Sequence, residues 1–272
     1  MKEGEVSWDG NSGMHELERV ADLVVRARRL VVFTGAGVST ESGIPDFRSP
    51  GGIWDRFDPD EFSYQNFIAS EAGRRKYWQL GRQLYAVVKN AQPNPAHYAI
   101  AELHGMGKLD CCITQNIDNL HQKAGLPPER VIELHGNATR ARCLKCERAY
   151  SRDQIQGWLE AGVEIPACDA SCGGIIKPNT ILFGEAMPAR ETQEAERRAK
   201  ASDLFIVVGS SLVVYPAAMM PIHAKEAGAK LVIINMSETP HDPYTDVRIQ
   251  MRAGEALTQI LEHVKRPSAA GP

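Results

Sequence analysis

The sequence lacks a long hydrophobic run, and it lacks an excess of charge of either sign. None of its apolar stretches approaches the length of a membrane span. The polar and acidic segment 1–13 has neither the basic start nor the apolar centre of a signal peptide. The net charge is −3, so no overall field attracts nucleic acid or an anionic membrane. We therefore expect a cytoplasmic protein that binds no nucleic acid directly and no membrane.

Cysteine is scarce too, with six residues in 272, and cytosolic proteins seldom use it in disulfides. Four of the six form two closely spaced pairs, Cys143 with Cys146 and Cys168 with Cys172. Two such pairs complete a tetrahedron, so the spacing predicts a structural zinc ion (Zn2+) with no open coordination position. Redox exchange at Cys143 and Cys146 is the competing interpretation, but it leaves the second pair unexplained. The other two cysteines are adjacent in a strand pattern, and we expect them to be buried apolar residues.

Apolar strand patterns alternate with amphipathic helical patterns over most of the chain. The expected strands are 30–34, 109–114, 131–134, 204–208 and 231–235. Continuous apolar strands separated by helices are typical of a parallel sheet that is covered on both faces. We therefore predict an α/β fold with a Rossmann-type parallel sheet, into which the cysteine-rich stretch 138–178 is inserted.

Small and polar residues follow these strands at their carboxyl ends, where open α/β sheets bind ligands. The turn Gly35-Ala36-Gly37 lets the backbone approach a ligand closely, as a pyrophosphate site requires. Gln115, Asn116 and Asp118 can hydrogen-bond a ribose and a carboxamide, although Asn116 or Asp118 can equally cap a helix. Further strand ends carry Gly209-Ser210-Ser211 and Asn235-Met236-Ser237. A nicotinamide dinucleotide (NAD) would span such a row of strand ends.

His135 follows the expected strand 131–134, again at a carboxyl end. An imidazole titrates near neutral pH and can take up a proton from a substrate there. A lone histidine is more often structural, and once this position is taken into account the catalytic and structural roles are equally supported.

Taken together, these motifs resemble those of the sirtuins, the NAD-dependent protein lysine deacylases. The matching segments are Gly35–Ser39, Gly43–Arg48, Thr114–His121, His135–Gly136, the two cysteine pairs, Phe183–Glu185, Gly209–Leu212 and Asn235. The resemblance covers about residues 14–265 and implies one catalytic core, in which acyl-lysine enters between a large and a small domain. The large domain would comprise about 14–48, 88–138 and 178–265, and the small domain a helical part at 49–87 and a zinc module at 139–177, with flexible tails at 1–13 and 266–272.

The resemblance also implies a reaction. The acyl oxygen of the substrate attacks C1′ of the NAD ribose, nicotinamide leaves, and free lysine and O-acetyl-ADP-ribose are released. His135 would be the general base that acts through the ribose, and Asn116 would hold the ribose and an ordered water. Asp118 with Ile117 would bind the carboxamide of nicotinamide. The implied partners are acyl-lysine proteins or peptides, and we expect the chain to be a monomer.

Other residues at matching positions are expected to bind NAD or the substrate. Phe47 would shield the reaction intermediate from water, and Arg48 would contact NAD from the same loop. The NAD-binding set is completed by Gly35, Ala36, Gly37, Thr40, Gln115, Gly209, Ser210, Ser211, Asn235 and Ser237. The expected substrate-binding residues are Ile181, Phe183, Gly184 and Val213.

Two departures from the family pattern bear on this interpretation. The second cysteine pair has three intervening residues where two are usual. The Tyr-x-x-Arg motif of the branch that removes succinyl or malonyl groups is absent, and the corresponding helix reads Tyr77-Trp78-Gln79-Leu80-Gly81-Arg82. A buried acyl carboxylate would then lack a bidentate partner, so we predict a preference for neutral acyl groups, acetyl first.

Two other functions remain open at this point. A protein mono-ADP-ribosyltransferase would use the same electrophilic carbon with a different nucleophile, so its product would differ. A non-catalytic module that binds NAD, or a partner through the zinc site, would need no base at His135, and this residue therefore argues against it.

Overall fold

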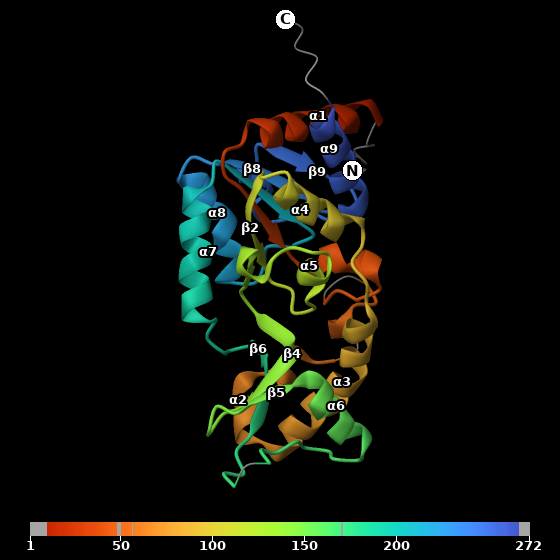
Figure 1. The fold of residues 1–272 in the computed structure, drawn as a ribbon, viewed down its shortest axis with the longest axis vertical. Helices are drawn as coiled ribbons and strands as arrows, with labels where there is room; N and C mark the ends of the chain where they lie inside the picture. The colour runs from red at the N-terminus through yellow and green to blue at the C-terminus, as the bar shows by residue number, and fades with distance from the viewer. Residues whose placement is uncertain (1–9, 48–49, 56, 170, 267–272) are drawn as a thin grey trace, which may run out of the picture.

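The structure, a computed structural model, describes residues 10–47, 50–55, 57–169 and 171–266 (Figure 1). Its centre is a six-stranded sheet in the order β3-β2-β1-β7-β8-β9, in which every neighbouring pair is parallel. The strands are β1 (Leu30–Thr34), β2 (Leu109–Thr114), β3 (Val131–Glu133), β7 (Leu204–Val208), β8 (Lys230–Ile234) and β9 (Val247–Ile249). The predicted fold is confirmed. Sequence patterns do not reveal β9, because three residues with an arginine in the middle form no recognisable run.

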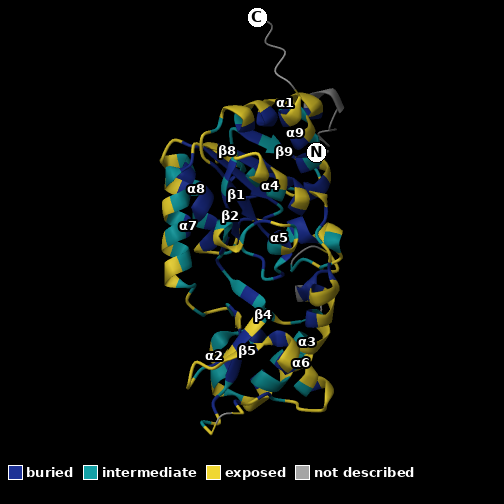
Figure 2. Cartoon of the chain, viewed as in Figure 1, coloured by how far each residue is buried: buried dark blue, intermediate teal, exposed yellow. Residues whose placement is uncertain are grey.

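Helices cover both faces of this sheet. The helices on one face are α1 (Gly10–Arg26), α4 (Pro95–Gly105) and α9 (Ala253–Lys265), and those on the other are α7 (Ala189–Ala201) and α8 (Met220–Glu226). Figure 2 shows the strands between them as buried. Successive strand residues alternate between the faces, so Cys111 lies in the core under α7 and α8 and Cys112 in the core under α1, α4 and α9. Both cysteines are buried, as predicted.

A second group of elements lies below the sheet in Figure 1. β5 (Ala149–Ser151), β4 (Gly136–Cys143) and β6 (Ile176–Thr180) form a three-stranded antiparallel sheet, and α2 (Tyr64–Ala69), α3 (Glu71–Asn90) and α6 (Arg152–Glu160) lie beside it. Trp78 of α3 shares a core with Tyr150 and Ile155, and the guanidinium of Arg152 lies 5.3 Å from the Trp78 ring centre. The helical and cysteine-rich segments therefore pack together, while the predicted domain boundaries stay a prediction.

Short elements connect these parts. They are the 3-10 turns η1 (Ala36–Ser42), η2 (Ile53–Asp55), η3 (Pro59–Phe62), η4 (Pro128–Arg130), η5 (Ala217–Met219) and η6 (Asp242–Tyr244), and the short helix α5 (Leu120–Lys123). Among the described residues, no helix has the length and the apolar character that crossing a membrane requires.

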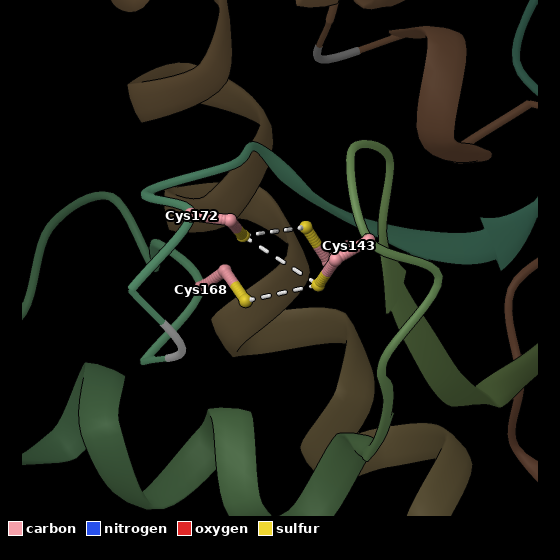
Figure 3. Close-up of side chains that lie close together, drawn as sticks. Cys143, Cys168 and Cys172 are labelled. Carbon is pink, nitrogen blue, oxygen red and sulfur yellow. Dashed lines mark hydrogen bonds between the residues drawn. The ribbon is translucent and has the colours of Figure 1, made fainter.

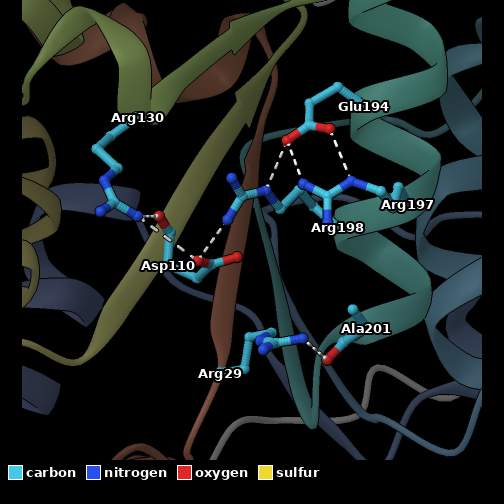
Figure 4. A network of polar contacts seen from close by, with 7 residues as sticks. All are labelled: Arg29, Asp110, Arg130, Glu194, Arg197, Arg198 and Ala201. Carbon is cyan, nitrogen blue, oxygen red and sulfur yellow. Dashed lines mark hydrogen bonds and ion pairs between the residues drawn. The ribbon is translucent and has the colours of Figure 1, made fainter.

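A network of charges ties α7 to the amino-terminal end of β2 (Figure 4). The carboxylate of Asp110 accepts from Nη1 of Arg198 at 2.6 Å, and its backbone carbonyl accepts from Arg130 at 3.0 Å. Hydrogen bonds from Arg197 and Arg198 lower the pKa of Glu194 to about 2. Because Asp110 lies at the end of β2 opposite the carboxyl edge, this network braces the sheet away from the predicted ligand site.

Candidate functional site

The first turn of the site leaves β1 through Gly35-Ala36-Gly37 and enters η1. The backbone N–H groups of Gly35 and Gly37 donate to the carbonyl oxygens of Val208 and Gly209, at 3.1 and 2.8 Å. A Cβ atom on either glycine would come within 2.8 Å of the Gly209 oxygen. The turn after β7 therefore requires that both residues lack a side chain, and the close approach of a ligand to this turn stays a prediction.

Two side chains from other elements anchor η1. Nδ2 of Asn94, at the start of α4, donates to the Val38 carbonyl oxygen at 2.8 Å and to Oγ of Ser42 at 3.0 Å. The Glu41 carboxylate accepts from the backbone N–H of Gly254 at 2.8 Å, and so caps α9, which has no side-chain cap of its own. The first half of the predicted NAD-binding loop is therefore fixed to two helices on the same face of the sheet.

The second half of this loop carries the predicted lid. Gly43 ends η1 with a φ of 80°, a conformation that glycine adopts without steric cost. Thr40 is exposed and Phe47 is half-buried. Arg48 lies outside the described residues. The roles of Thr40, Phe47 and Arg48 toward NAD stay predictions.

Three buried polar side chains meet between η1 and the turn after β2. Oγ of Ser39 donates to Oδ2 of Asp118 at 2.7 Å and accepts from Nδ2 of Asn116 at 3.1 Å. The other carboxylate oxygen of Asp118 accepts from the backbone N–H of Leu120 at 2.9 Å, at the start of α5. Asp118 thus takes the capping role left open by the sequence and also belongs to the polar cluster. Ser39 ends the matching segment Gly35–Ser39, but the sequence predicts no separate role for it, and its contacts with Asn116 and Asp118 come from the structure.

His135 lies just past β3 and is half-buried. Its Nδ1 is 3.1 Å from the carbonyl oxygen of Gln115. A carbonyl oxygen only accepts, so Nδ1 of the neutral ring carries the hydrogen and Nε2 carries the lone pair. Burial lowers the pKa of His135 below its ordinary value of 6.5, and the hydrogen bond with Gln115 opposes this effect. At pH 7 the ring is therefore in its proton-accepting form.

Gln115 connects His135 to the next strand end. Its Nε2 donates to Oγ of Ser210 at 2.8 Å, and that oxygen also accepts from the backbone N–H of Leu212 at 3.3 Å. The ends of β3, β2, β1, β7 and β8 are neighbours in the sheet. The structure thus brings the predicted residues to one edge: Gly35, Ala36, Gly37, Gln115, Asn116, Ile117, Asp118, His135, Gly209, Ser210, Ser211, Asn235 and Ser237.

The predicted substrate-binding segment begins next to His135. The backbone N–H of Ile181 donates to the His135 carbonyl oxygen at 2.9 Å, and the Phe183 carbonyl accepts from Tyr64 of α2 at 2.8 Å. The segment 181–184 therefore runs from His135 toward the elements below the main sheet. Val213, the fourth predicted residue, follows β7 and has an exposed fraction of 44%.

A buried ion pair that sequence patterns do not reveal fixes this segment. Nζ of Lys177 is 2.9 Å from Oε2 of Glu185, and the same oxygen accepts from the backbone N–H of Leu182 at 2.9 Å. The Lys177 ammonium also donates to the Thr180 carbonyl oxygen at 2.6 Å. Burial lowers the pKa of Lys177 and the Glu185 carboxylate opposes this effect. The pair closes the loop around Gly184, whose φ of 75° is in the left-handed region.

The four predicted zinc ligands converge, and Figure 3 labels three of them, Cys143, Cys168 and Cys172. Their sulfur atoms lie within 4.8 Å of one another, with 3.7 Å between Cys143 and Cys172, 3.7 Å between Cys146 and Cys168, and 3.5 Å between Cys146 and Cys172. Tetrahedral zinc with bonds of about 2.3 Å separates its sulfur ligands by about 3.8 Å. The donor set and its spacing therefore fit Zn2+.

The turns around this centre are shaped for thiolates. Backbone N–H groups of Lys145 and Gly174 donate to Sγ of Cys143 and Cys172, both at 3.4 Å. A Cβ atom on Gly174 would lie 2.5 Å from the Cys143 sulfur, so only glycine fits there. The longer second spacing includes residue 170, which is outside the described residues. It does not prevent the four sulfur atoms from meeting.

Comparisons with known proteins agree with this geometry. A model of the Sir2 family matches residues 35–216. The chain is 47% identical over 247 residues to NAD-dependent protein deacylase 2 of Pyrobaculum aerophilum, covering 91% of this chain and 95% of that protein. It is 46% identical over 253 residues to the NAD-dependent protein deacetylase of Caldivirga maquilingensis, covering 93% and 95%. The solved structure described as "Sir2-p53 peptide-NAD+" has a TM-score of 0.83 at 37% identity, covering 90% of this chain and 97% of its own. The chain therefore belongs to the Sir2 family.

Proposed function

We propose that this chain removes acyl groups from lysine side chains of proteins and consumes NAD in doing so. The relatives above are named NAD-dependent protein deacylase and deacetylase, and the similar Sir2 structure holds a peptide and NAD+. The observation that carries the proposal is the tautomer of His135, whose Nε2 lone pair is fixed by the contact of Nδ1 with Gln115. A protein that only binds NAD does not need a base held in this way.

Different residues of the chain have different proposed roles in this reaction. His135 keeps its Nδ1–H on the Gln115 carbonyl and takes a proton from a ribose hydroxyl at Nε2. Ser39 orients Asn116 and Asp118, so that Asn116 holds the ribose and Asp118, with Ile117, holds the carboxamide. NAD, as co-substrate, supplies the electrophilic ribose carbon from which nicotinamide leaves.

The wider binding set is also a proposal. Phe47 and Arg48 cover the reacting ribose. The other residues proposed to contact NAD are Gly35, Ala36, Gly37, Thr40, Gln115, Gly209, Ser210, Ser211, Asn235 and Ser237, and those proposed to contact the acyl-lysine peptide are Ile181, Phe183, Gly184 and Val213. The proposed NAD contacts are supported by the shared carboxyl edge of the sheet. The proposed peptide contacts are supported by the hydrogen bond between Ile181 and His135.

Zinc has a structural task. Four thiolates fill a tetrahedral shell, so the ion bound to Cys143, Cys146, Cys168 and Cys172 has no position left for water or substrate. The metal stabilises the turns between β4 and β6, and it supplies no step of the reaction.

The proposed preference for neutral acyl groups is supported by two of the three arginines of α3, Arg74 and Arg75; the third, Arg82, is exposed. Arg74 donates to two backbone carbonyl oxygens at the end of α2, at 3.0 and 2.9 Å. Arg75 pairs with Glu71 and Glu164, at 3.2 and 2.9 Å. Both guanidinium groups are engaged with their own surroundings, so neither provides a bidentate partner for an acyl carboxylate. Acetyl-lysine is therefore the substrate that we propose first.

Three further proposals concern the protein in the cell. We propose that it is a monomer, that it works in the cytoplasm, and that it binds no nucleic acid directly. The net charge of −3 supports the last of these.

The reaction products test the proposed function. Incubation with NAD and an acetylated peptide should yield nicotinamide, O-acetyl-ADP-ribose and the free lysine peptide. His135→Ala should lower turnover by roughly a hundredfold or more while NAD still binds, whereas His104→Ala, in the last turn of α4, should change neither. If labelled ADP-ribose instead stays on protein and no O-acetyl-ADP-ribose forms, the proposed deacylation is wrong and the chain transfers ADP-ribose. The names of the two relatives do not suggest such a transfer.

A further inference from the structure

Two buried histidines lie next to the catalytic edge and have no part in the proposed reaction. His97 of α4 and His121 of α5 have exposed fractions of 0% and 2%, and their ring centres are 5.0 Å apart. Each ring has one nitrogen without a hydrogen-bond partner among the described residues, Nε2 in His97 and Nδ1 in His121. Buried polar atoms are rarely left unpaired, so these two nitrogens require an explanation.

The tautomer of His97 follows from the cap of α4. Nδ1 of His97 is 3.3 Å from the backbone nitrogen of Asn94, which can only donate. Nδ1 therefore accepts, and the hydrogen of the neutral ring is on Nε2. Burial lowers the pKa of His97 to about 4 although the charge of Asp118 opposes it, so the ring is neutral at pH 7. The unpaired atom of His97 is a donor.

The tautomer of His121 follows from two threonines. Oγ1 of Thr114 accepts from the backbone N–H of Asn116 at 3.0 Å and from the hydroxyl of Thr34 at 2.8 Å. Thr34 has thereby used its only hydrogen, so at 2.9 Å its oxygen accepts from Nε2 of His121. Burial, assisted by His97, lowers the pKa of His121 to about 3, and the neutral ring carries its lone pair on Nδ1. The unpaired atom of His121 is an acceptor.

Cys112 does not change this assignment. Its sulfur is 3.6 Å from Nε2 of His121 and 3.9 Å from Oγ1 of Thr34. Burial raises the pKa of the Cys112 thiol, so the sulfur stays protonated and is a weak hydrogen-bond partner. Thr34 remains the principal partner of the His121 ring.

We propose that Nε2–H of His97 donates to Nδ1 of His121, directly or across one water molecule, and that both rings are positioning residues for the turn Thr114–Asp118. The link joins an unpaired donor to an unpaired acceptor on two rings whose centres are 5.0 Å apart. It completes a chain of hydrogen bonds from Asn94 through both histidines and two threonines to the backbone of Asn116.

With this link, η1 and the turn Thr114–Asp118 are both held in place through Asn94. Asn94 begins this chain with its backbone and anchors η1 with its side chain. The chain of hydrogen bonds ends on the backbone of Asn116, and the side chain of Asn116 contacts Ser39 of η1. The two halves of the polar cluster are thus held from one point at the start of α4. The positioning role rests on the proposed deacylation, whereas the tautomers and the link do not.

Nitrogen NMR on the full chain labelled with 15N-histidine tests the link. At pH 7 both His97 and His121 should give the pattern of a neutral ring protonated at Nε2. A scalar coupling between Nε2 of His97 and Nδ1 of His121 would identify the direct form, and a cross-relaxation signal from that N–H to a long-lived water would identify the bridged form. A charged ring, an Nδ1–H tautomer at either position, or the lack of both signals would overturn the proposal.

Two variants of His97 test the positioning role. His97→Asn keeps an acceptor for the Asn94 N–H but removes the donor toward His121, and His97→Gln supplies both an amide oxygen for that N–H and an amide N–H at the position of Nε2. We expect kcat for nicotinamide release to fall roughly tenfold or more in the first variant, with an unchanged KM for the peptide, and to stay near that of the parent in the second. His104→Asn is the matched control on α4. Equal loss in both His97 variants, or loss in neither, would show that the role is wrong. Product formation by the unmodified chain tests the proposed function separately.

Discussion

At the scale of single residues, the site depends on which nitrogen of each imidazole carries the hydrogen. In His135 the Gln115 carbonyl holds the hydrogen on Nδ1 and leaves Nε2 able to accept a proton. In His97 and His121 donors and acceptors from the neighbouring backbone and hydroxyl groups place it on Nε2. One residue type can thus act as the proposed base at one position and as the proposed neutral connector at two others, because its partners differ.

The pH dependence of deacylation should reflect the lowered pKa of His135. The base works only when Nε2 is unprotonated, and burial moves the pKa below 6.5, so activity should persist as the pH falls through 6.5 and disappear only at lower pH. We expect the acid limb of kcat/KM for acetyl-peptide, measured at saturating NAD, to lie below pH 6.5. The residual activity of His135→Gln should show no such limb. An acid limb at or above 6.5 in the parent protein would contradict the assignment.

Sequence patterns find some of these residues and not others. His135 and the segment Gln115–Asp118 are visible because they directly follow recognisable apolar strands. The contacts of Ser39 with Asp118 and between the two buried histidines are not visible, since they join segments that are far apart in the chain. His97 and His121 lie in helices α4 and α5. A helical sequence pattern says nothing of the hydrogen bonds that their rings make.

At the scale of elements, two turns form the predicted zinc centre. One turn follows β4 and the other precedes β6, and both place a backbone N–H close to a sulfur. Tyr150 of β5 places its hydroxyl 3.0 Å from Sγ of Cys168 but donates the hydroxyl hydrogen to Oδ1 of Asp169 at 2.6 Å. Hydrogen bonds to thiolate sulfur orient metal ligands, so the two backbone N–H groups support the site although they do not touch the ion. Cysteine spacing predicts the ligands, but the supporting contacts require the structure.

Gly174→Ala should weaken zinc binding. The added Cβ would lie 2.5 Å from the Cys143 sulfur and 2.8 Å from Cβ of Lys145, so a ligand must move. We expect a lower zinc content after dialysis against a weak chelator, together with a lower midpoint of thermal unfolding. Gly157→Ala in α6 is the matched control, because a Cβ there meets nothing within 4 Å and alanine favours a helix by about 0.5–1 kcal/mol. Retention of full zinc content by Gly174→Ala would show that the turn tolerates the side chain.

At the scale of the whole molecule, the two groups of elements are joined where α3 ends and α4 begins. Nζ of Lys123, in α5, donates to the carbonyl oxygens of Lys89 and Ala91 at 3.1 Å each, and so caps the end of α3. Asn94, a few residues later, caps α4 and anchors η1. The segment between α3 and α4 therefore contacts α5, next to the turn after β2, and η1. No periodicity in the sequence indicates these contacts.

The preference for an acyl group depends on the whole molecule, because the proposed acyl-lysine substrate contacts residues of both groups of elements. We expect acetyl-lysine to be removed at least roughly tenfold faster, in kcat/KM, than succinyl-lysine in the same peptide, since a buried carboxylate would lose hydration without gaining an arginine partner. Nicotinamide release from a panel of acyl peptides measures this ratio. A propionyl peptide is the matched neutral control for size. Faster removal of the succinyl group would refute the proposed preference.

The cap that Glu41 provides for α9 has a consequence for how the protein is made. Glu41 lies near the beginning of the chain, and Gly254, whose N–H it accepts, lies in the last helix of the described residues. A ribosome releases the N-terminal part of a protein first. On a nascent chain, η1 therefore lacks its contact with Gly254 until α9 has left the exit tunnel. The proposed NAD-binding loop is among the first segments synthesised, yet one of its anchors forms only after almost all of the chain has been made.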